Sequence, residues 1–231
     1  MTPVKQAEQF VEALQKFPTL TGVFNPWADY DEEHDTSPKN AEVRAEHLVR
    51  YLSERIGRAR SVLIAEAPGY QGCHFSGIAM TSERILLGFQ KHNDVRPEDV
   101  FNGAATRTSK EIKLGGFNEP TATIVWKAIK QSGVDPRDVV LWNSFAFHPM
   151  KNSWLTNRKP TPAELQKARH LLEHFLSLFS TAFVVPVGRV AEEILSDMSI
   201  ACSGYVRHPA NGGATDFRTG MGVYWAPEAA L

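Results

Sequence analysis

Leu63-Ile-Ala-Glu-Ala-Pro-Gly-Tyr-Gln-Gly-Cys-His-Phe-Ser-Gly77 joins a short apolar segment to a turn rich in glycine and proline. The segment that ends at Ala65 is continuously apolar and rich in branched side chains, which is typical of a buried strand. Pro68 removes a backbone donor and Gly69 permits a close backbone approach, so we expect the strand to stop before them. In an α/β sheet, ligands bind beyond the carboxyl ends of the strands. The stretch therefore predicts a strand followed by a ligand-binding turn.

Helix and strand signals alternate on both sides of this stretch. Apolar residues have helical spacing over residues 4–17 and 41–56. A helix headed by proline follows Asn118, its expected cap, and a capping box opens another helix at Thr161. Further strands are expected at residues 139–142, 182–187 and 202–206. This alternation predicts a single α/β domain over residues 1–231, a three-layer α/β/α sandwich around a mostly parallel four-stranded sheet.

The composition is that of an ordinary globular chain. Its 231 residues are 42% hydrophobic and 22% charged, and the formal net charge is -1, which argues against nonspecific coating of DNA but permits a local basic groove. Two cysteines cannot make a disulfide framework or a four-cysteine metal site, so we expect a cytoplasmic, soluble protein. No apolar run reaches 18 residues, which predicts no membrane span. The acidic run at residues 29–35 is interpreted as a solvated surface loop.

Polar side chains follow three of the predicted strands. Glu66 comes after the first, Asn143 and His148 after the second, and His208 after the last. Because the turns after parallel strands open on one edge of the sheet, we expect these side chains to gather there. Asparagine offers a donor beside an acceptor, which suits the amide-like edge of a nucleobase, and histidine can donate to an oxygen that gains negative charge. Each also has a structural interpretation: Asn143 can satisfy its own turn, and the histidines, each followed by proline, can be surface or structural residues.

Three motifs in this order resemble the signature motifs of the uracil-DNA glycosylase superfamily. They are Glu66-Ala-Pro-Gly69, Asn143 at the end of its strand, and His208-Pro-Ala210. The first is most similar to the Gly-Glu-Ala-Pro-Gly motif of the iron–sulfur branch, with Ala65 in place of the first glycine. The cysteines that hold the cluster in that branch are absent here, so we expect no cluster.

The resemblance implies a monofunctional DNA repair glycosylase that flips uracil out of DNA and hydrolyses its N-glycosidic bond, leaving an abasic site. Asn143 would pair with N3–H and O4 of uracil, and His208 would donate to O2 as the base leaves as an anion. Glu66 would be the second catalytic residue. The uracil pocket would contain these three side chains together with Ala67, Gly69, Tyr70 and Met80. No metal or organic cofactor is implied, and we expect a monomer whose partner is uracil-containing DNA.

The pocket departs from the family pattern at three positions. Ala67 stands where the best-known relatives place the aspartate that positions water. Gly69 stands where they use a tyrosine to exclude the thymine methyl group, a role that Tyr70 or another residue could take. Met80 falls near the phenylalanine on which uracil stacks, and a thioether can pack against a base without offering a ring face.

The last motif is expected to contact DNA. Its DNA-binding residues would be Arg207, Ala210, Asn211, Gly212 and Arg218, the arginines through phosphates. Ala210 replaces the usual serine, which removes one possible phosphate contact. Gly212 falls where a leucine would wedge into the duplex, so Asn211 or Phe217 would have to fill that gap.

Two other classes of function stay open. The first is a metal-dependent hydrolase that uses His148, His208 and Glu66, although the histidines lack helical His-x-x-x-His spacing. The second is a nucleic-acid-binding relative that has lost catalysis, which the departures at Ala67 and Met80 motivate. Chelator sensitivity separates the first from a glycosylase, and the formation of abasic sites separates the second.

Overall fold

Strand β2 (Ser61–Ala65) is the centre of the sheet in the computed structural model, which describes residues 1–90 and 94–225. All five of its residues are buried, because a central parallel strand is covered on both faces. β3 (Val139–Asn143) and β5 (Phe183–Pro186) flank it, both parallel. The register pairs Ala65 with Asn143, so β2 and β3 end at the same edge. The predicted α/β fold with a parallel sheet is confirmed.

The predicted fourth strand is reduced to one parallel bridge, between Val187 and Val206. The amide of Val206 donates to Pro186 O at 3.1 Å, and the amide of Gly188 donates to Val206 O at 2.8 Å. Gly204 just before the bridge has no side chain to pack, which weakens strand pairing. The expected four-stranded sheet is therefore three strands and a bridge, and the bridge still brings the last motif to the edge where β2 and β3 end.

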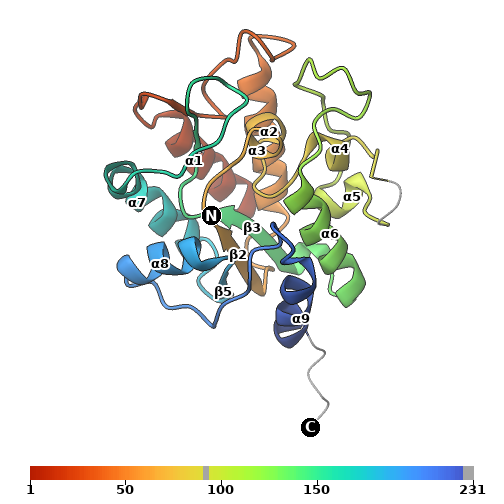
Figure 1. The fold of residues 1–231 in the computed structure, drawn as a ribbon, viewed down its shortest axis with the longest axis vertical. Helices are drawn as coiled ribbons and strands as arrows, with labels where there is room; N and C mark the ends of the chain where they lie inside the picture. The colour runs from red at the N-terminus through yellow and green to blue at the C-terminus, as the bar shows by residue number, and fades with distance from the viewer. Residues whose placement is uncertain (91–93, 226–231) are drawn as a thin grey trace.

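Helices lie on both sides of the sheet (Figure 1). The longer ones are α1 (Pro3–Gln15), α2 (Asn40–Ser53), α6 (Pro120–Ser132), α7 (Pro162–Ser177), α8 (Arg189–Asp197) and α9 (Ala214–Trp225). α1 contacts α2 and α7, α8 contacts β5 and β2, and α6 contacts α9. Figure 1 shows α1, α7 and α8 on one side of the strands and α6 and α9 on the other. The sequence patterns did not predict α9.

Short elements complete the fold. They are β1 (Val23–Phe24), α3 (Cys73–Ser76), α4 (Glu83–Leu86), α5 (Pro97–Val100), a 3-10 helix (Pro136–Asp138) and β4 (His148–Pro149). β1 and β4 pair as a separate antiparallel ribbon. Among the helices that the structure describes, none is long and apolar enough to cross a membrane.

The helix ends test two sequence predictions. The capping box of α7 is confirmed, because Thr161 accepts from the amide of Glu164 while the Glu164 carboxylate accepts from the amide of Thr161. The predicted cap of α6 is wrong by one residue. Its N-cap is Glu119 rather than Asn118, and the Glu119 side chain makes no capping hydrogen bond.

The acidic run is only partly the solvated loop that the sequence predicted, since Glu32 and Glu33 are exposed but two aspartates are not. Asp31 and Asp35 are fully buried. Asp35 forms an ion pair with buried Arg44, with 2.6 Å between Oδ1 and Nη1, and Asp31 Oδ2 lies 3.2 Å from Nε2 of buried His74. Buried carboxylates require partners of this kind, and those partners lie too far along the chain for a local charge pattern to reveal them.

Candidate functional site

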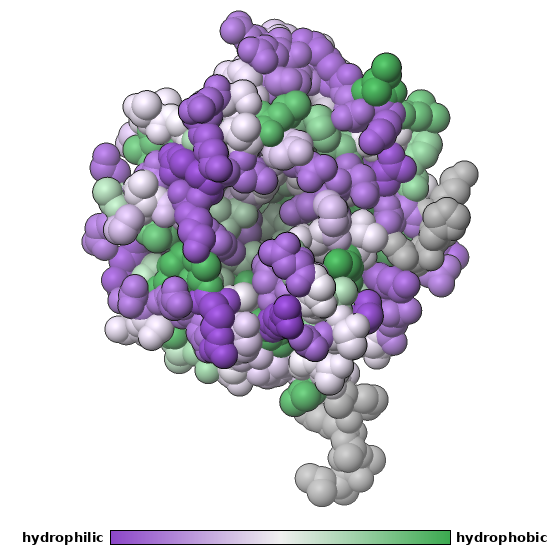
Figure 2. Space-filling model, viewed as in Figure 1, coloured by the Kyte–Doolittle hydropathy of each residue, from purple (hydrophilic) through white to green (hydrophobic). Residues whose placement is uncertain are grey.

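A cavity of about 580 Å³ lies beyond the carboxyl ends of β2 and β3. Figure 2 shows one face of the molecule hollowed near its centre, with hydrophilic residues around much of the hollow. Six residues predicted for the base pocket line the cavity: Glu66, Ala67, Gly69, Met80, Asn143 and His208. The three motifs, which are far apart in the sequence, therefore meet in one place. This place is the crevice beyond the carboxyl ends of the parallel strands, where ligands bind in open α/β sheets.

Tyr70 is the one predicted pocket residue that does not line the cavity. Its ring packs edge-on against Phe117, with 6.0 Å between the ring centroids. The space beside Gly69 is taken instead by Asn157, because a Cβ atom at Gly69 would lie 3.4 Å from Asn157 Nδ2. Asn157 lines the cavity, and no sequence pattern had singled it out.

Met80 lines the cavity with an unusual backbone. Its φ is 47°, in the left-handed region, although it is not a glycine. Non-glycine residues rarely adopt this conformation, and they tend to cluster at functional sites where the surrounding structure holds them. Met80 is nearly fully buried, so the strained backbone fixes a thioether in the cavity wall.

Asn143 has its side-chain amide free for a ligand. The turn after β3 is satisfied by its neighbours, since the amide and hydroxyl of Ser144 donate to Ala65 O at 2.7 and 3.1 Å and the amide of Phe145 donates to Glu66 O at 3.0 Å. Within the described residues, the Asn143 side chain makes no hydrogen bond, although the residue is only 3% exposed. The Asn143 side chain therefore does not satisfy the turn, and a donor and an acceptor remain without a protein partner on a residue that lines the cavity.

His208 is held in one tautomer by the turn that follows it. Its Nδ1 accepts from the amide of Ala210 at 3.1 Å, so in the neutral ring the hydrogen is on Nε2. Burial lowers the pKa of His208, which favours this neutral form. Gly188 packs behind the histidine, where a Cβ atom would come within 3.0 Å of the His208 Cβ. The ring therefore presents Nε2–H as a fixed donor.

Two carboxyl groups line the cavity, and the sequence predicted only one of them. Burial raises the pKa of Glu66, against the opposing charge of Lys159. Burial also raises the pKa of Glu119, to about 7. Cys73 lines the cavity as well, and burial together with the nearby Glu119 raises the pKa of its thiol. A thiol in that environment stays protonated and is a poor nucleophile.

His148 lies behind the cavity wall rather than in it. Its Nε2 donates to Thr156 O at 2.9 Å and to Asn157 Oδ1 at 3.0 Å, and its Nδ1 is 2.8 Å from His74 Nδ1. Burial lowers its pKa to about 4. Both ring nitrogens are thus used, so His148 cannot join His208 and Glu66 as a metal ligand. In the described part of the chain, no cluster of three or more His, Cys, Asp or Glu side chains could hold a metal ion.

Arg207 and Arg218 lie on either side of the loop after His208, and both already have partners. Arg207 forms an ion pair with Asp216 at 2.7 Å, and Arg218 Nη2 donates to Thr215 Oγ1 at 3.3 Å. Both arginines nevertheless lie at the surface, where surface pairs are weak and can be exchanged for phosphate.

The tip of the same loop carries the residues expected to occupy the gap that a flipped base leaves in the duplex. Asn211 and Gly212 are both exposed, with φ of 52° and 79°, and Ala210 is partly buried between them and His208. Phe217 is fully buried in the core. It therefore cannot serve as the wedge, which corrects one of the two sequence-based suggestions and leaves Asn211.

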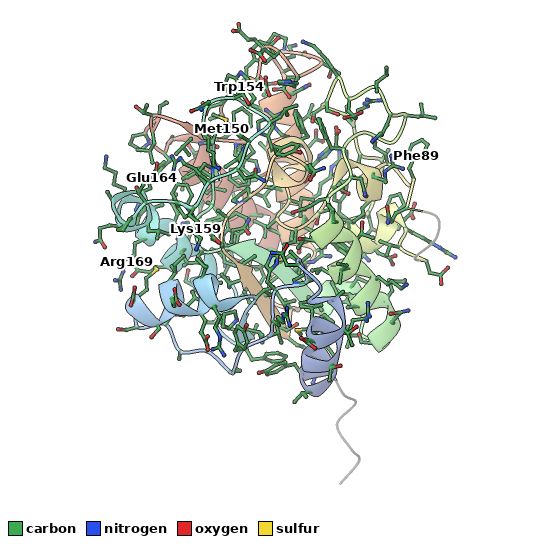
Figure 3. All side chains as sticks on the ribbon, viewed as in Figure 1. Phe89, Met150, Trp154, Lys159, Glu164 and Arg169 are labelled. Atoms are coloured by element: carbon green, nitrogen blue, oxygen red, sulfur yellow. The ribbon has the colours of Figure 1, made fainter. Side chains whose placement is uncertain are left out.

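Two lysines stand at the cavity rim. Lys151 and Lys159 line the cavity and are exposed, and within the described residues neither ammonium group makes a hydrogen bond or an ion pair. Arg158 between them is committed to Glu164, with 2.6 Å between Nη2 and Oε1. Figure 3 shows Lys159 on the same side of the molecule as Glu164. Sequence reasoning missed this basic loop because its charges are interleaved with neutral residues.

Comparison with known proteins gave two findings. The model of the Uracil DNA glycosylase superfamily matches residues 54–226. Among solved structures, the crystal structure of wild-type SMUG2 from Pedobacter heparinus is similar, with a TM-score of 0.58 and 13% sequence identity over 97% of this chain and 94% of that chain. At this identity the likeness concerns the fold. The comparison with curated proteins gave no match.

Proposed function

Because the chain belongs to the uracil DNA glycosylase superfamily, a family of DNA repair glycosylases, we propose that it excises uracil from DNA by hydrolysing the N-glycosidic bond. The observation that carries this proposal is that Asn143 and His208 line one cavity, each with an unused polar group. The protein would act as a monomer, with residues 1–231 as one glycosylase domain, and would leave an abasic site.

Asn143 supplies the recognition of uracil. Uracil has a donor at N3–H next to an acceptor at O4, and one rotamer of an asparagine amide complements both. Cytosine presents the reverse pattern on the same edge, so its polar groups would face like groups in the pocket. A buried site made to pair with one pattern rejects the other strongly, because the mismatched groups are left without partners.

His208 supplies the stabilisation of the leaving group. As the C1′–N1 bond breaks, its electron pair goes to the base and negative charge builds on O2 of uracil. The Nε2–H of His208 is fixed as a donor before the reaction, so it can meet this charge without reorganisation. The sugar becomes an oxocarbenium ion, which a negative charge on Glu66 can stabilise from the same cavity.

The rim of the cavity supports binding of a flipped nucleotide. Extruding a base from the duplex costs a few kcal/mol of stacking and pairing. Contacts to the neighbouring phosphates offset this cost, and Lys151 and Lys159 have free ammonium groups at the rim. The exposed tip at Asn211 would occupy the gap left in the duplex.

One experiment tests the proposal directly. The protein is incubated with single- and double-stranded oligonucleotides that contain uracil, and abasic sites are cleaved with alkali. We expect strand cleavage at uracil and persistence of the activity in excess EDTA. Intact strands with uracil and with other deaminated bases, despite binding of the oligonucleotide, would favour the relative that has lost catalysis. Activity that EDTA abolishes and zinc restores would favour a metal-dependent hydrolase.

A further inference from the structure

Glu119 has the position of a helix cap but not the contacts of one. It is the N-cap residue of α6, yet its side chain accepts no hydrogen bond from the helix amides. The carboxyl group instead lines the cavity, and its Oε2 atom is buried without any hydrogen-bond partner in the part of the chain that the structure describes. A glutamate that leaves a helix end uncapped and places an unpaired oxygen in a cavity wall requires an explanation.

The chain around Glu119 leaves room for this arrangement. A Cβ atom at Gly72 would overlap Oε2 of Glu119, so only glycine is compatible with the carboxyl group at this place. Gly72 is the N-cap residue of α3, the helix whose first residue, Cys73, lies in the same cavity wall. The turn after β2 and the start of α6 are therefore fitted together around the carboxyl group.

Oε2 has no surface that a water molecule could reach, so only a proton on the carboxyl group can satisfy it, while other atoms of Glu119 line the cavity. The protonated and ionised forms of Glu119 are both accessible near neutral pH, because burial raises its pKa to about 7. A group that changes its protonation state at the working pH is well suited to general acid–base catalysis. The cavity also has space for water beside a flipped pyrimidine.

We propose that Glu119 is a catalytic residue that binds the hydrolytic water and takes its proton, an assignment that rests on the glycosylase function proposed above. The C1′–N1 bond breaks and its electron pair leaves with the base as an anion. The water oxygen forms the new bond to C1′, one water proton passes to the Glu119 carboxylate and then to solvent, and the base anion takes a proton from solvent. Glu119 would thus position the water, the role for which the sequence offers no carboxylate at Ala67.

The other ionisable groups around the cavity are consistent with Glu119 as the base. Burial raises the pKa of Glu66 but the opposite charge of Lys159 opposes that rise, whereas no charge opposes the effect of burial on the pKa of Glu119, so of the two Glu66 is better suited to stabilising the cation. Burial lowers the pKa of His208 and raises that of the Cys73 thiol, so neither changes its charge near pH 7. Lys151 completes the charged groups that line the cavity with Lys159 and the paired Arg158.

The test is the pH profile of single-turnover base release from a uracil-containing oligonucleotide, for wild type, Glu119→Gln and Glu66→Gln. Wild type should speed up with pH to a plateau above about 7, where Glu119 is ionised. The rising part of this pH profile is its limb near pH 7. Glu119→Gln should lose the limb and release base about 10²-fold more slowly than wild type at pH 8, which is the lower end of the effect of a general base. At pH 6 the deficit should shrink to about tenfold, because about a tenth of wild-type Glu119 is ionised there. Glu66→Gln should be slower while keeping the limb near 7.

Each result decides the assignment. An unchanged rate in Glu119→Gln, or a slow variant that keeps the limb near 7, would overturn Glu119 as the base while leaving the glycosylase function intact. Loss of the limb in Glu66→Gln instead would transfer the role to Glu66. If wild type releases no base from any lesion, the glycosylase function itself fails and the water assignment falls with it.

Discussion

The side-chain oxygen of Asn157 accepts a hydrogen bond from the backbone amide of Tyr70 at 3.1 Å, and so ties the basic loop to the turn after β2. The same oxygen accepts from Nε2 of His148 at 3.0 Å. Two donors thus fix the amide of Asn157, and its Nδ2 faces the place where Gly69 has no side chain. The cavity wall beside Gly69 is thus built by a residue 87 positions away from Tyr70 in the sequence.

Asn157→Ala should weaken binding of uracil-containing DNA without unfolding the protein. The Tyr70 amide is exposed enough to bond to water, so the expected cost is about 1 kcal/mol, roughly fivefold in affinity. Binding isotherms on an oligonucleotide measure it. Asn157→Asp is the matched control, because its carboxylate still accepts from both donors. Equal affinity of the alanine variant and wild type would show that the tie does not shape the site.

His208→Ala should lower the rate of base release by roughly 10²–10³, the usual loss for one preorganised donor to a developing oxyanion. Substrate binding should change much less, because the contact strengthens only as charge builds on O2. Single-turnover rates and binding isotherms on one oligonucleotide separate the two effects. A rate equal to that of wild type would remove His208 from the mechanism.

Asn143→Ala should cost about 1–3 kcal/mol of uracil recognition, because polar edges of the base are then buried unpaired. Asn143→Asp should be at least as damaging. Its carboxylate can accept from N3–H, but it places negative charge beside O4 and opposes departure of an anionic base. Rates for uracil against cytosine at the same sequence position measure both variants, and a fully active aspartate variant would refute the contact.

The central strand and the three motifs could be predicted from the sequence because their signals are local. A strand covered on both faces has an unbroken apolar run, and β2 ends at Ala65 as predicted. Asn143 ends β3 and His208 follows the parallel bridge at Val206, so their meeting at one edge follows from the parallel topology.

The remainder depends on partners that are distant in the sequence. Asp35 was taken for a solvated residue because its partner Arg44 lies on α2 and no pattern joins them. Glu119 and Asn157 are single polar residues in unremarkable surroundings, and only the fold shows that they line the cavity. The predicted strand at residues 202–206 forms only a bridge at Val206, which is held by one hydrogen bond to β5 and one from the amide of Gly188. The strand propensity of the segment could not show how few such hydrogen bonds form.

Glu119→Gln should make the protein more stable at pH 8. The pKa of Glu119 is about 7 in the folded chain against 4.5 for an ordinary glutamate, so the folded state holds its proton more tightly. Stability from this group is complete below 4.5 and is lost as pH rises through 7, a loss of about 3 kcal/mol. Denaturant unfolding at pH 5 and pH 8 measures the difference. The gain in the variant should appear at pH 8 only, and a gain of the same size at both pH values would contradict it.

Lys159→Ala and Lys151→Ala should each make DNA binding less dependent on salt. Every phosphate contact that is lost reduces the slope of log affinity against log salt concentration by roughly 1. These lysines have no ion-pair partner among the described residues, whereas Arg207 must first leave Asp216. Binding to one oligonucleotide over a series of salt concentrations compares the lysine variants with Arg207→Ala.

Lys167→Ala, on the exposed face of α7 and outside the cavity, is the control. We expect the larger change from the rim lysines, because an unpaired ammonium group can bind phosphate without breaking an existing contact. A larger change in Arg207→Ala would instead place the main phosphate contacts on the loop after His208.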